Sequence, residues 1–166
     1  MSRSEFPTPI GQRYFEDYHK GAVFEYGPIS VSEVEIIDFA KRFDPQVMHV
    51  DPQAASRGPF KGLIASGWHT IGLMMRLFAD NYISAVASLA SPGVDEVRWY
   101  KPVRPDDALR LRVSILETKT SRSKPDRGMV HSLLEGIDQN GDTVASLKAM
   151  NLIGLRMASP TSRSEA

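Results

Sequence analysis

The residues best suited to chemistry gather in one short stretch, Asp44 to Asp51 (DPQVMHVD). Asp44 and His49 lie five positions apart, and Pro45 restricts the backbone between them. A carboxylate and an imidazole that face one water molecule can divide proton removal and proton supply between them. The pair therefore predicts acid–base catalysis that acts on water.

Simpler interpretations apply to the same residues. Asp44 could end one helix or cap the next turn, and a histidine in a loop is often an ordinary surface residue. Asp44, His49 and Asp51 could instead bind a metal ion, but one imidazole with two carboxylates is a weak signal for such a site. We therefore expect neither a metal nor another cofactor.

Gly67 supplies the second chemical feature, because it opens a strongly apolar run that extends to Ala79. The run is apolar around almost its whole circumference, which predicts a long helix buried on all sides. The first N–H groups of a helix lack intrahelical partners and carry partial positive charge. They could hold a carbonyl oxygen that becomes an enolate, although a glycine before a helix often only marks the boundary between loop and helix. An acid–base pair beside such an oxyanion site is what the addition of water to an activated double bond requires.

The segments around the Asp44–His49 stretch must position it. Ala22 to Ile29 is predicted as a strand, and Ser32 with Glu35 forms a capping-box pattern that opens a helix. This helix should end near Phe43, because a proline disfavours helical backbone at the residue before it. Residues 44–66 lack a clean period and are rich in proline and glycine, which favours a functional loop, with one short helical turn at 54–55.

The sequence after residue 80 changes from a helical period to a period of two. Asn81 to Ala90 is predicted as a second helix of small residues. Four strands with a tight hairpin at 138–142 should follow: Val94–Trp99, Leu109–Ile115, Met129–Ile137 and Thr143–Leu155. The predicted fold class is α+β, with a curved antiparallel sheet wrapped around the long central helix.

Length and composition limit the remaining possibilities. The chain has 166 residues, which predicts one domain at 10–157 with flexible tails at 1–9 and 158–166. Lys plus Arg and Asp plus Glu are both 20, which argues against nucleic acid or a membrane as a partner. Without cysteine there is no thiol nucleophile or zinc ribbon, and without an apolar leader or span we expect a cytoplasmic protein.

Three landmarks in this order resemble the MaoC-like dehydratase family, which includes the (R)-specific enoyl-CoA hydratases. The family loop reads approximately D-x-N-P-x-H; here Gln46 and Val47 stand in the Asn and Pro places between Asp44 and His49. The second landmark is the stretch that opens the central helix, Ile64-Ala65-Ser66-Gly67, with serine where the family often has histidine. The third is the strand Val97-Arg98-Trp99-Tyr100-Lys101-Pro102-Val103, followed by an Asp-containing turn.

The resemblance implies a hot-dog fold and, as substrate, an acyl thioester of coenzyme A or of acyl carrier protein. Asp44 would be the general base and His49 would hold the water and share the proton transfer, while the Gly67 N–H would bind the thioester carbonyl. Which of the pair takes the proton stays open, because two close groups titrate as a unit. Gln46, Ser66 and Trp68 are the candidate substrate-binding residues.

The activity that the resemblance implies is reversible hydration of a 2-enoyl-CoA to a 3-hydroxyacyl-CoA. A thioesterase on the same fold and a non-catalytic acyl-thioester-binding protein are the alternatives. An intact Asp44–His49 pair favours the enzyme over the binding protein. Hot-dog proteins generally pair, so a homodimer or a higher homo-oligomer is expected.

Overall fold

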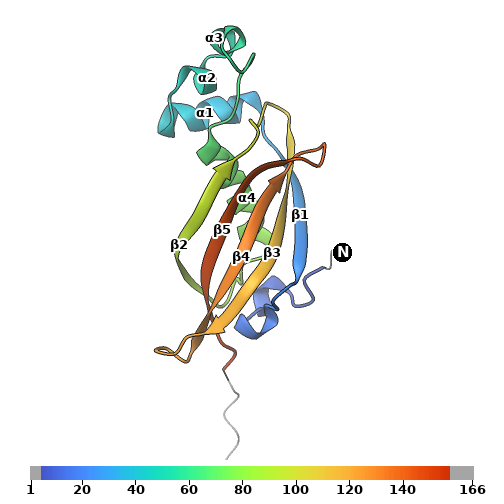
Figure 1. The fold of residues 1–166 in the computed structure, drawn as a ribbon, viewed down its shortest axis with the longest axis vertical. Helices are drawn as coiled ribbons and strands as arrows, with labels where there is room; N and C mark the ends of the chain where they lie inside the picture. The colour runs from blue at the N-terminus through green and yellow to red at the C-terminus, as the bar shows by residue number, and fades with distance from the viewer. Residues whose placement is uncertain (1–4, 158–166) are drawn as a thin grey trace, which may run out of the picture.

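The computed structural model describes residues 5–157 of the chain (Figure 1). The predicted tail at 158–166 and the first four residues lie outside the described residues. Two short 3-10 turns and nine longer elements follow one another along the chain: η1 (Ile10–Gln12), η2 (Phe15–Asp17), β1 (Val23–Ser30), α1 (Glu33–Phe43), α2 (Val47–Val50), α3 (Pro52–Arg57), α4 (Gly67–Asn81), β2 (Ser88–Trp99), β3 (Ala108–Thr120), β4 (Arg127–Ile137) and β5 (Thr143–Gly154).

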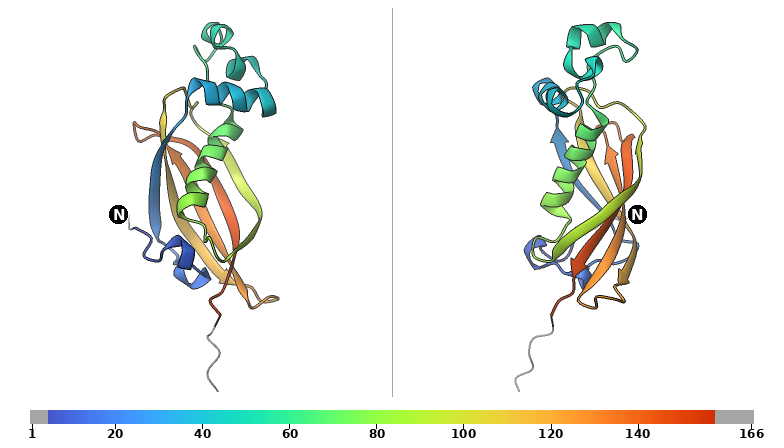
Figure 2. Two further views of the ribbon diagram at one scale, coloured as in Figure 1. Left: turned by 180° about the vertical axis from the view of Figure 1, so that it is seen from behind. Right: turned by 90° about the vertical axis from the view of Figure 1, so that its left-hand side faces the viewer.

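The five strands form one antiparallel sheet in the order β1-β3-β4-β5-β2. The sheet curves around α4, which lies along its inner face (Figure 2). The predicted α+β class and the wrapped central helix are therefore confirmed. The edge strands β1 and β2 both end at the end of the sheet where α4 begins, next to the helices α1–α3 (Figures 1 and 2).

Alternating burial explains why the strands hold the helix. Every second residue at the start of β3 is buried, including Leu111 and Val113, and β4 repeats the alternation. From α4, Met74 and Phe78 meet this inner face of the sheet and are almost fully buried. The period of two on the strands and the helical period on α4 thus supply the two halves of one core.

The amino-terminal segment packs against the far end of the core. Phe6 precedes the predicted start of the domain but is buried and stacks on Phe24, with 4.7 Å between the ring centroids. The guanidinium of Arg13 lies over the Phe6 ring and donates to the carbonyl oxygens of Asn81 and Tyr82 at the end of α4. Phe6 is therefore part of the core, while the domain limits stay a prediction.

Two expectations about α4 and the segment after it were wrong. In the single chain α4 is not buried on all sides, because the sheet covers only one face and leaves Trp68 59% and Met75 51% exposed. Asn81 to Ala90 is not a second helix, since α4 itself continues to Asn81 and β2 begins at Ser88. Small residues carry little periodic signal, and pairing of β2 with β5 decides the conformation of this segment.

The predicted loop at 44–66 contains two short helices that stand beyond the end of the sheet (Figure 1). Asp51 accepts a hydrogen bond from the N–H of Ala54 and so caps α3, whose first residue is Pro52. We call residues 44–66 the overhang. Across residues 5–157, no helix is both long and apolar enough to cross a membrane.

Candidate active site

Asp44 and Ser66 sit at helix ends that face each other. Asp44 is the C-cap residue of α1, whose start is closed by the predicted Ser32–Glu35 capping box. Ser66 is the N-cap residue of α4, and its hydroxyl donates to Oδ2 of Asp44 over 2.7 Å. The two helices therefore fix the carboxylate between them, although 22 residues separate the partners in sequence.

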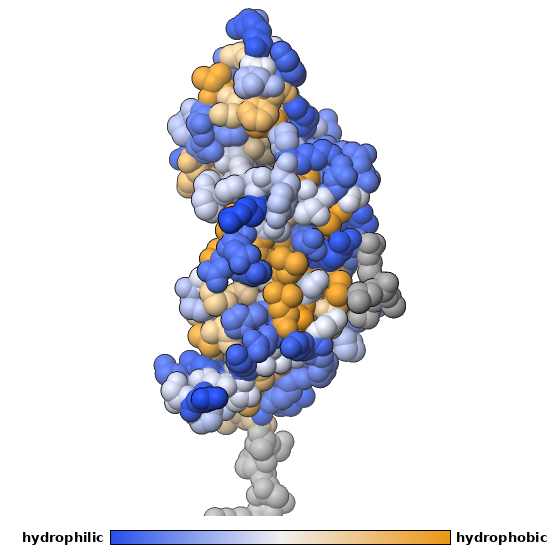
Figure 3. Space-filling model, viewed as in Figure 1, coloured by the Kyte–Doolittle hydropathy of each residue, from blue (hydrophilic) through white to orange (hydrophobic). Residues whose placement is uncertain are grey.

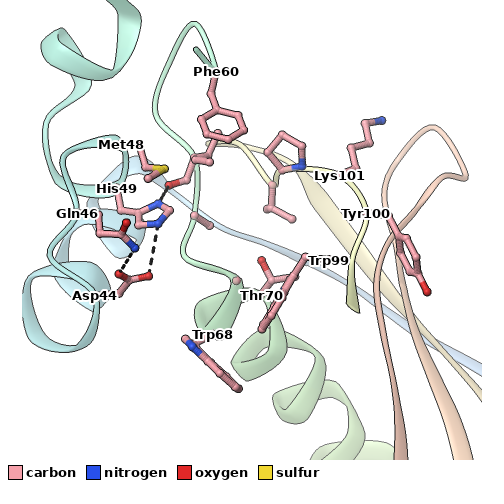
Figure 4. Close-up of a pocket in the computed structure, with 15 residues that line it drawn as sticks. Asp44, Gln46, Met48, His49, Phe60, Trp68, Thr70, Trp99, Tyr100 and Lys101 are labelled. Carbon is pink, nitrogen blue, oxygen red and sulfur yellow. Dashed lines mark hydrogen bonds and ion pairs between the residues drawn. The ribbon is translucent and has the colours of Figure 1, made fainter. Parts of the chain in front are cut away.

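His49 lies in α2 and is buried. Its Nδ1 is 2.7 Å from the carbonyl oxygen of Ile64. Because a carbonyl oxygen can only accept, Nδ1 carries the proton and Nε2 of the neutral ring keeps its lone pair. This Nε2 lies 3.4 Å from Oδ2 of Asp44, so the predicted pair comes together in the fold (Figure 4).

Both oxygens of Asp44 accept hydrogen bonds. The Ser66 hydroxyl donates to Oδ2, and the side-chain amide of Gln46 donates to Oδ1 over 2.7 Å. These bonds hold the pKa of the Asp44 carboxyl below its usual value, the Ser66 bond most strongly, and the nearby His49 adds a smaller effect in the same direction. Asp44 is therefore held as a carboxylate.

The amino end of α4 lacks a side-chain cap, because the Ser66 hydroxyl donates its hydrogen bond to Asp44 instead. The first hydrogen bond of the helix runs from the N–H of Thr70 to the carbonyl oxygen of Ser66. The N–H of Gly67 precedes this bond, and Gly67 lines the cavity beside Asp44 and His49. A donor at a helix start, next to an acid–base pair, is the geometry that stabilises a developing oxyanion.

Gly67 also permits a close approach by an aromatic ring. A Cβ atom at this position would lie 2.5 Å from two ring atoms of Trp99, on the edge strand β2. Trp68 meets the same ring edge-on, with 5.2 Å between the centroids. The close packing against Trp99 therefore favours glycine at this position.

A cavity of about 470 Å³ joins these groups (Figure 4). Among the predicted site residues, Asp44, Gln46, His49, Gly67 and Trp68 line it, whereas Ser66 is fully buried behind Asp44. Sequence reasoning missed several lining residues: Met48, Thr70, Trp99 and Val103. Trp99 and Val103 belonged to the third landmark, but nothing in the sequence alone indicated that this strand reaches the helix start.

Three polar residues near the site have other partners. His69 stacks on Phe39 at a centroid distance of 4.6 Å, and burial lowers the pKa of its imidazole while Glu35 opposes that shift. Asp51 caps α3, and within the described part of the chain no cluster of three His, Cys, Asp or Glu side chains could hold a metal ion. Lys101, a cation that lines the cavity, is paired with Asp138 and Asp142.

Two solved structures have the same fold as this chain. A MaoC-like dehydratase structure from Rhodospirillum rubrum superimposes with a TM-score of 0.81 at 32% identity and covers 88% of this chain and 99% of its own. The R-hydratase of Pseudomonas aeruginosa shares the fold, with a TM-score of 0.71 at 22% identity, over 92% of this chain and 96% of that one. These matches confirm the hot-dog fold.

Two curated relatives are similar in sequence. An uncharacterized Bacillus subtilis protein, YdeM, is 35% identical over 109 residues, or 66% of this chain and 77% of YdeM. The 3-hydroxyacyl-thioester dehydratase Z of Mycobacterium tuberculosis is 32% identical over 90 residues, 53% of this chain and 60% of the dehydratase. The model of the MaoC like domain matches residues 16–134. The chain therefore belongs to the MaoC-like dehydratase family.

Proposed function

We propose that this protein is a hydro-lyase that adds water reversibly to a 2-enoyl-CoA and gives a 3-hydroxyacyl-CoA. The observation that carries the proposal is the approach of His49 Nε2 to Asp44 Oδ2, at 3.4 Å, beside the uncapped start of α4. Membership of the MaoC-like family and similarity to a 3-hydroxyacyl-thioester dehydratase support it.

The proposed pair orients one water molecule. With the proton on Nδ1 of His49, both Nε2 and the Asp44 carboxylate are acceptors, so a water can donate one hydrogen to each. The water oxygen is then directed toward the third carbon of the enoyl group. The hydrogen bonds from Ser66 and Gln46 make Asp44 a weaker base, which favours His49 Nε2 as the proton acceptor, in place of the Asp44 base that the resemblance implied.

The proposed reaction has two stages. As the water oxygen bonds to C3, one water proton moves to Nε2 of His49, and the C2=C3 electron pair shifts toward the thioester oxygen. The Gly67 N–H donates to this oxygen as its negative charge grows, and Asp44 stabilises the imidazolium. The proton then passes to C2, the carbonyl re-forms, and the site returns to its initial state. Dehydration is the same path in reverse.

The Asp44→Asn variant tests this function. It keeps the size of the side chain but removes the charge that stabilises protonated His49, so we expect the hydration rate to fall about 10²–10⁴-fold. The loss of enoyl absorbance measures hydration, and far-UV circular dichroism controls for folding. Hydration by Asp44→Asn at the wild-type rate would contradict the mechanism.

The same assay separates the alternative functions. A thioesterase would release free thiol, which a thiol reagent detects, whereas a hydratase consumes the double bond and leaves the thioester intact. A non-catalytic binding protein would bind acyl-CoA and do neither.

We also propose that the active form is a homodimer. The exposed face of α4 and the edge strand β2 carry five exposed apolar side chains: Trp68, Met75, Leu89, Val94 and Trp99. An edge strand with free hydrogen-bonding groups beside an apolar helix face is suited to pairing with the same surface of a second copy. Trp68 and Trp99 also line the cavity, so this pairing would complete its rim.

A further inference from the structure

We infer that Arg104 is a positioning residue for His49, although it lies outside the cavity. It acts through the peptide group between Ile64 and Ala65, which binds the imidazole on one side and the connection from β2 to β3, residues 100–107, on the other. The inference rests on the proposed hydration reaction and adds a residue on which the orientation of its proton acceptor depends.

The peptide group between Ile64 and Ala65 has a hydrogen-bond partner at each end. Its carbonyl oxygen, on Ile64, accepts from Nδ1 of His49 over 2.7 Å. Its N–H, on Ala65, donates to the carbonyl oxygen of Val103 over 2.8 Å. Because a peptide group is planar, a rotation that weakens one of these bonds also displaces the other. The proton on Nδ1 of His49 and the lone pair on Nε2 therefore depend on the contact with Val103.

This hydrogen-bonded chain is buried. Its four residues are each at most 6% exposed: His49, Ile64, Ala65 and Val103. Water cannot replace a bond that is lost there, and successive hydrogen bonds strengthen one another in a medium of low dielectric constant. The N–H of Ile64 also donates to the carbonyl oxygen of Met48, which links the same segment to α2. A small shift of residues 64–65 should therefore reach the His49 ring.

The side chain of Arg104 holds the loop that leads into this segment. Its Nη2 donates to the carbonyl oxygen of Phe60 over 2.6 Å, and its Nη1 would lie 3.3 Å from a Cβ atom at Gly62. Residues 58–62 are exposed or half-buried, and apolar side chains reach the surface at this end of the molecule (Figure 3). A loop that buries little apolar surface depends on such hydrogen bonds for its position.

The backbone of Arg104 is itself fixed. Its N–H donates to Oδ2 of Asp107 over 2.8 Å, and Oδ1 of Asp107 accepts from the side-chain amide of Gln139 in the β4–β5 hairpin. The N–H of Asp106 donates to the carbonyl oxygen of Val31, directly before the N-cap residue of α1. The guanidinium therefore reaches the overhang from a turn that is anchored to the sheet and to the start of α1.

Arg104 does not contact the space where the substrate would bind. Pro102 and Val103 are among the described residues that line the cavity, and Arg104 is not. The loss of its side chain should therefore misorient His49 without removing a substrate contact. This predicts a fall in kcat that exceeds any change in KM.

The test compares Arg104→Met, which keeps the aliphatic stem and removes the donors, with the wild type. In nitrogen-15 NMR at alkaline pH, where an imidazole is neutral, wild-type His49 should carry its proton on Nδ1, and Arg104→Met should lower the share of this tautomer. For the faster of 2-butenoyl- and 2-octenoyl-CoA, kcat should fall about tenfold while KM stays within about threefold.

Two matched variants separate positioning from a general loss of charge. Arg104→Lys keeps a charged donor of similar reach and should recover most of the tautomer share and of kcat. Arg127→Met removes another half-buried arginine, at the start of β4 and the opposite end of the sheet, and should match the wild type. Arg104→Ala repeats the loss of the donors, so that the test stands if circular dichroism shows Arg104→Met to be unfolded.

An ester in place of the amide between Ile64 and Ala65 tests the middle of the chain, because it removes only the N–H that donates to Val103. It should lower the Nδ1 tautomer share as well. An unchanged tautomer and kcat in the Arg104 variants would overturn the inference, and so would a rise in KM alone, which would make Arg104 a substrate contact. If the wild type hydrates no enoyl-CoA, the proposed function fails, and the tautomer measurement alone decides the role of Arg104.

Discussion

Asp44 is a carboxylate whose two oxygens are both occupied by donors, and this arrangement sets its chemistry more than burial does. Spacing and family resemblance predicted that Asp44 and His49 would meet. They did not predict that Ser66 binds Asp44, because a contact across 22 residues depends on how α1 and α4 pack. The sequence indicated which groups react, and the fold determines how they are held.

Ser66→Ala tests the hydrogen bond to Asp44, because it removes only the donating hydroxyl. Its loss should raise the pKa of Asp44 toward the ordinary value, because the Ser66 bond is the largest cause of the lowering. Because the proposed mechanism also needs His49 Nε2 unprotonated, an NMR titration of the Asp44 carboxyl carbon measures this shift more directly than a pH–rate profile. Ser66→Thr retains a hydroxyl and should keep the Asp44 pKa near its wild-type value; an unchanged Asp44 pKa in Ser66→Ala would show that the bond is unimportant.

The same bond links the pKa of Asp44 to stability. The folded pKa lies below the ordinary value of 3.8, so the bond stabilises the folded state above that pH and this contribution is lost as the pH falls through the folded pKa. A hydrogen bond to a charged group contributes roughly 1.5–3 kcal/mol. The difference between wild type and Ser66→Ala in urea unfolding should therefore shrink in acid.

At the scale of elements, the strength of each local signal decided which parts were predictable. The capping box at Ser32 and the alternation in β3 and β4 are consistent with their tertiary surroundings, and these elements appear where they were predicted, although β3 continues to Thr120. The start of β2 carries no such local pattern, and its pairing with β5 was invisible in the sequence. The helices α2 and α3 are too short to produce a clear period.

The contact between α4 and β2 can be measured with Gly67→Ala. The added Cβ would clash with Trp99, so we expect lower stability and at least a tenfold lower kcat/KM. In a Trp99→Ala background the clash is absent and alanine is the better helix former, so the stability cost should vanish or change sign. Urea unfolding of wild type, the two single variants and the double variant gives the coupling free energy between residues 67 and 99. If Gly67→Ala lowers the free energy of unfolding equally in both backgrounds, the Trp99 contact does not restrict residue 67.

At the scale of the whole molecule, the exposed apolar face explains why the prediction of a fully buried α4 failed. The apolar pattern of α4 is real, but in one chain the sheet covers only part of it. An apolar pattern in the sequence predicts that a helix face is buried, but it does not indicate whether the same chain or a second copy covers that face. The remaining face is therefore consistent with a partner copy.

Met75→Glu tests the proposed homodimer. A charge in the middle of the exposed face should oppose pairing, so the mass in light scattering should fall from twice 18.4 kDa toward 18.4 kDa. Leu116→Glu introduces the same charge at an exposed apolar position on β3 and should leave the mass unchanged. A wild-type mass of 18.4 kDa at micromolar concentration would refute the dimer.

Because the Ser66 hydroxyl donates to Asp44, the first turn of α4 lacks the side-chain N-cap that Ser32 provides for α1. Its amide hydrogens should consequently exchange with deuterated solvent faster than those at the start of α1. A thioester oxygen in the cavity would accept from this turn and slow the exchange. The amide exchange rate at the start of the central helix would then report whether a thioester occupies the cavity, even when no substrate is turned over.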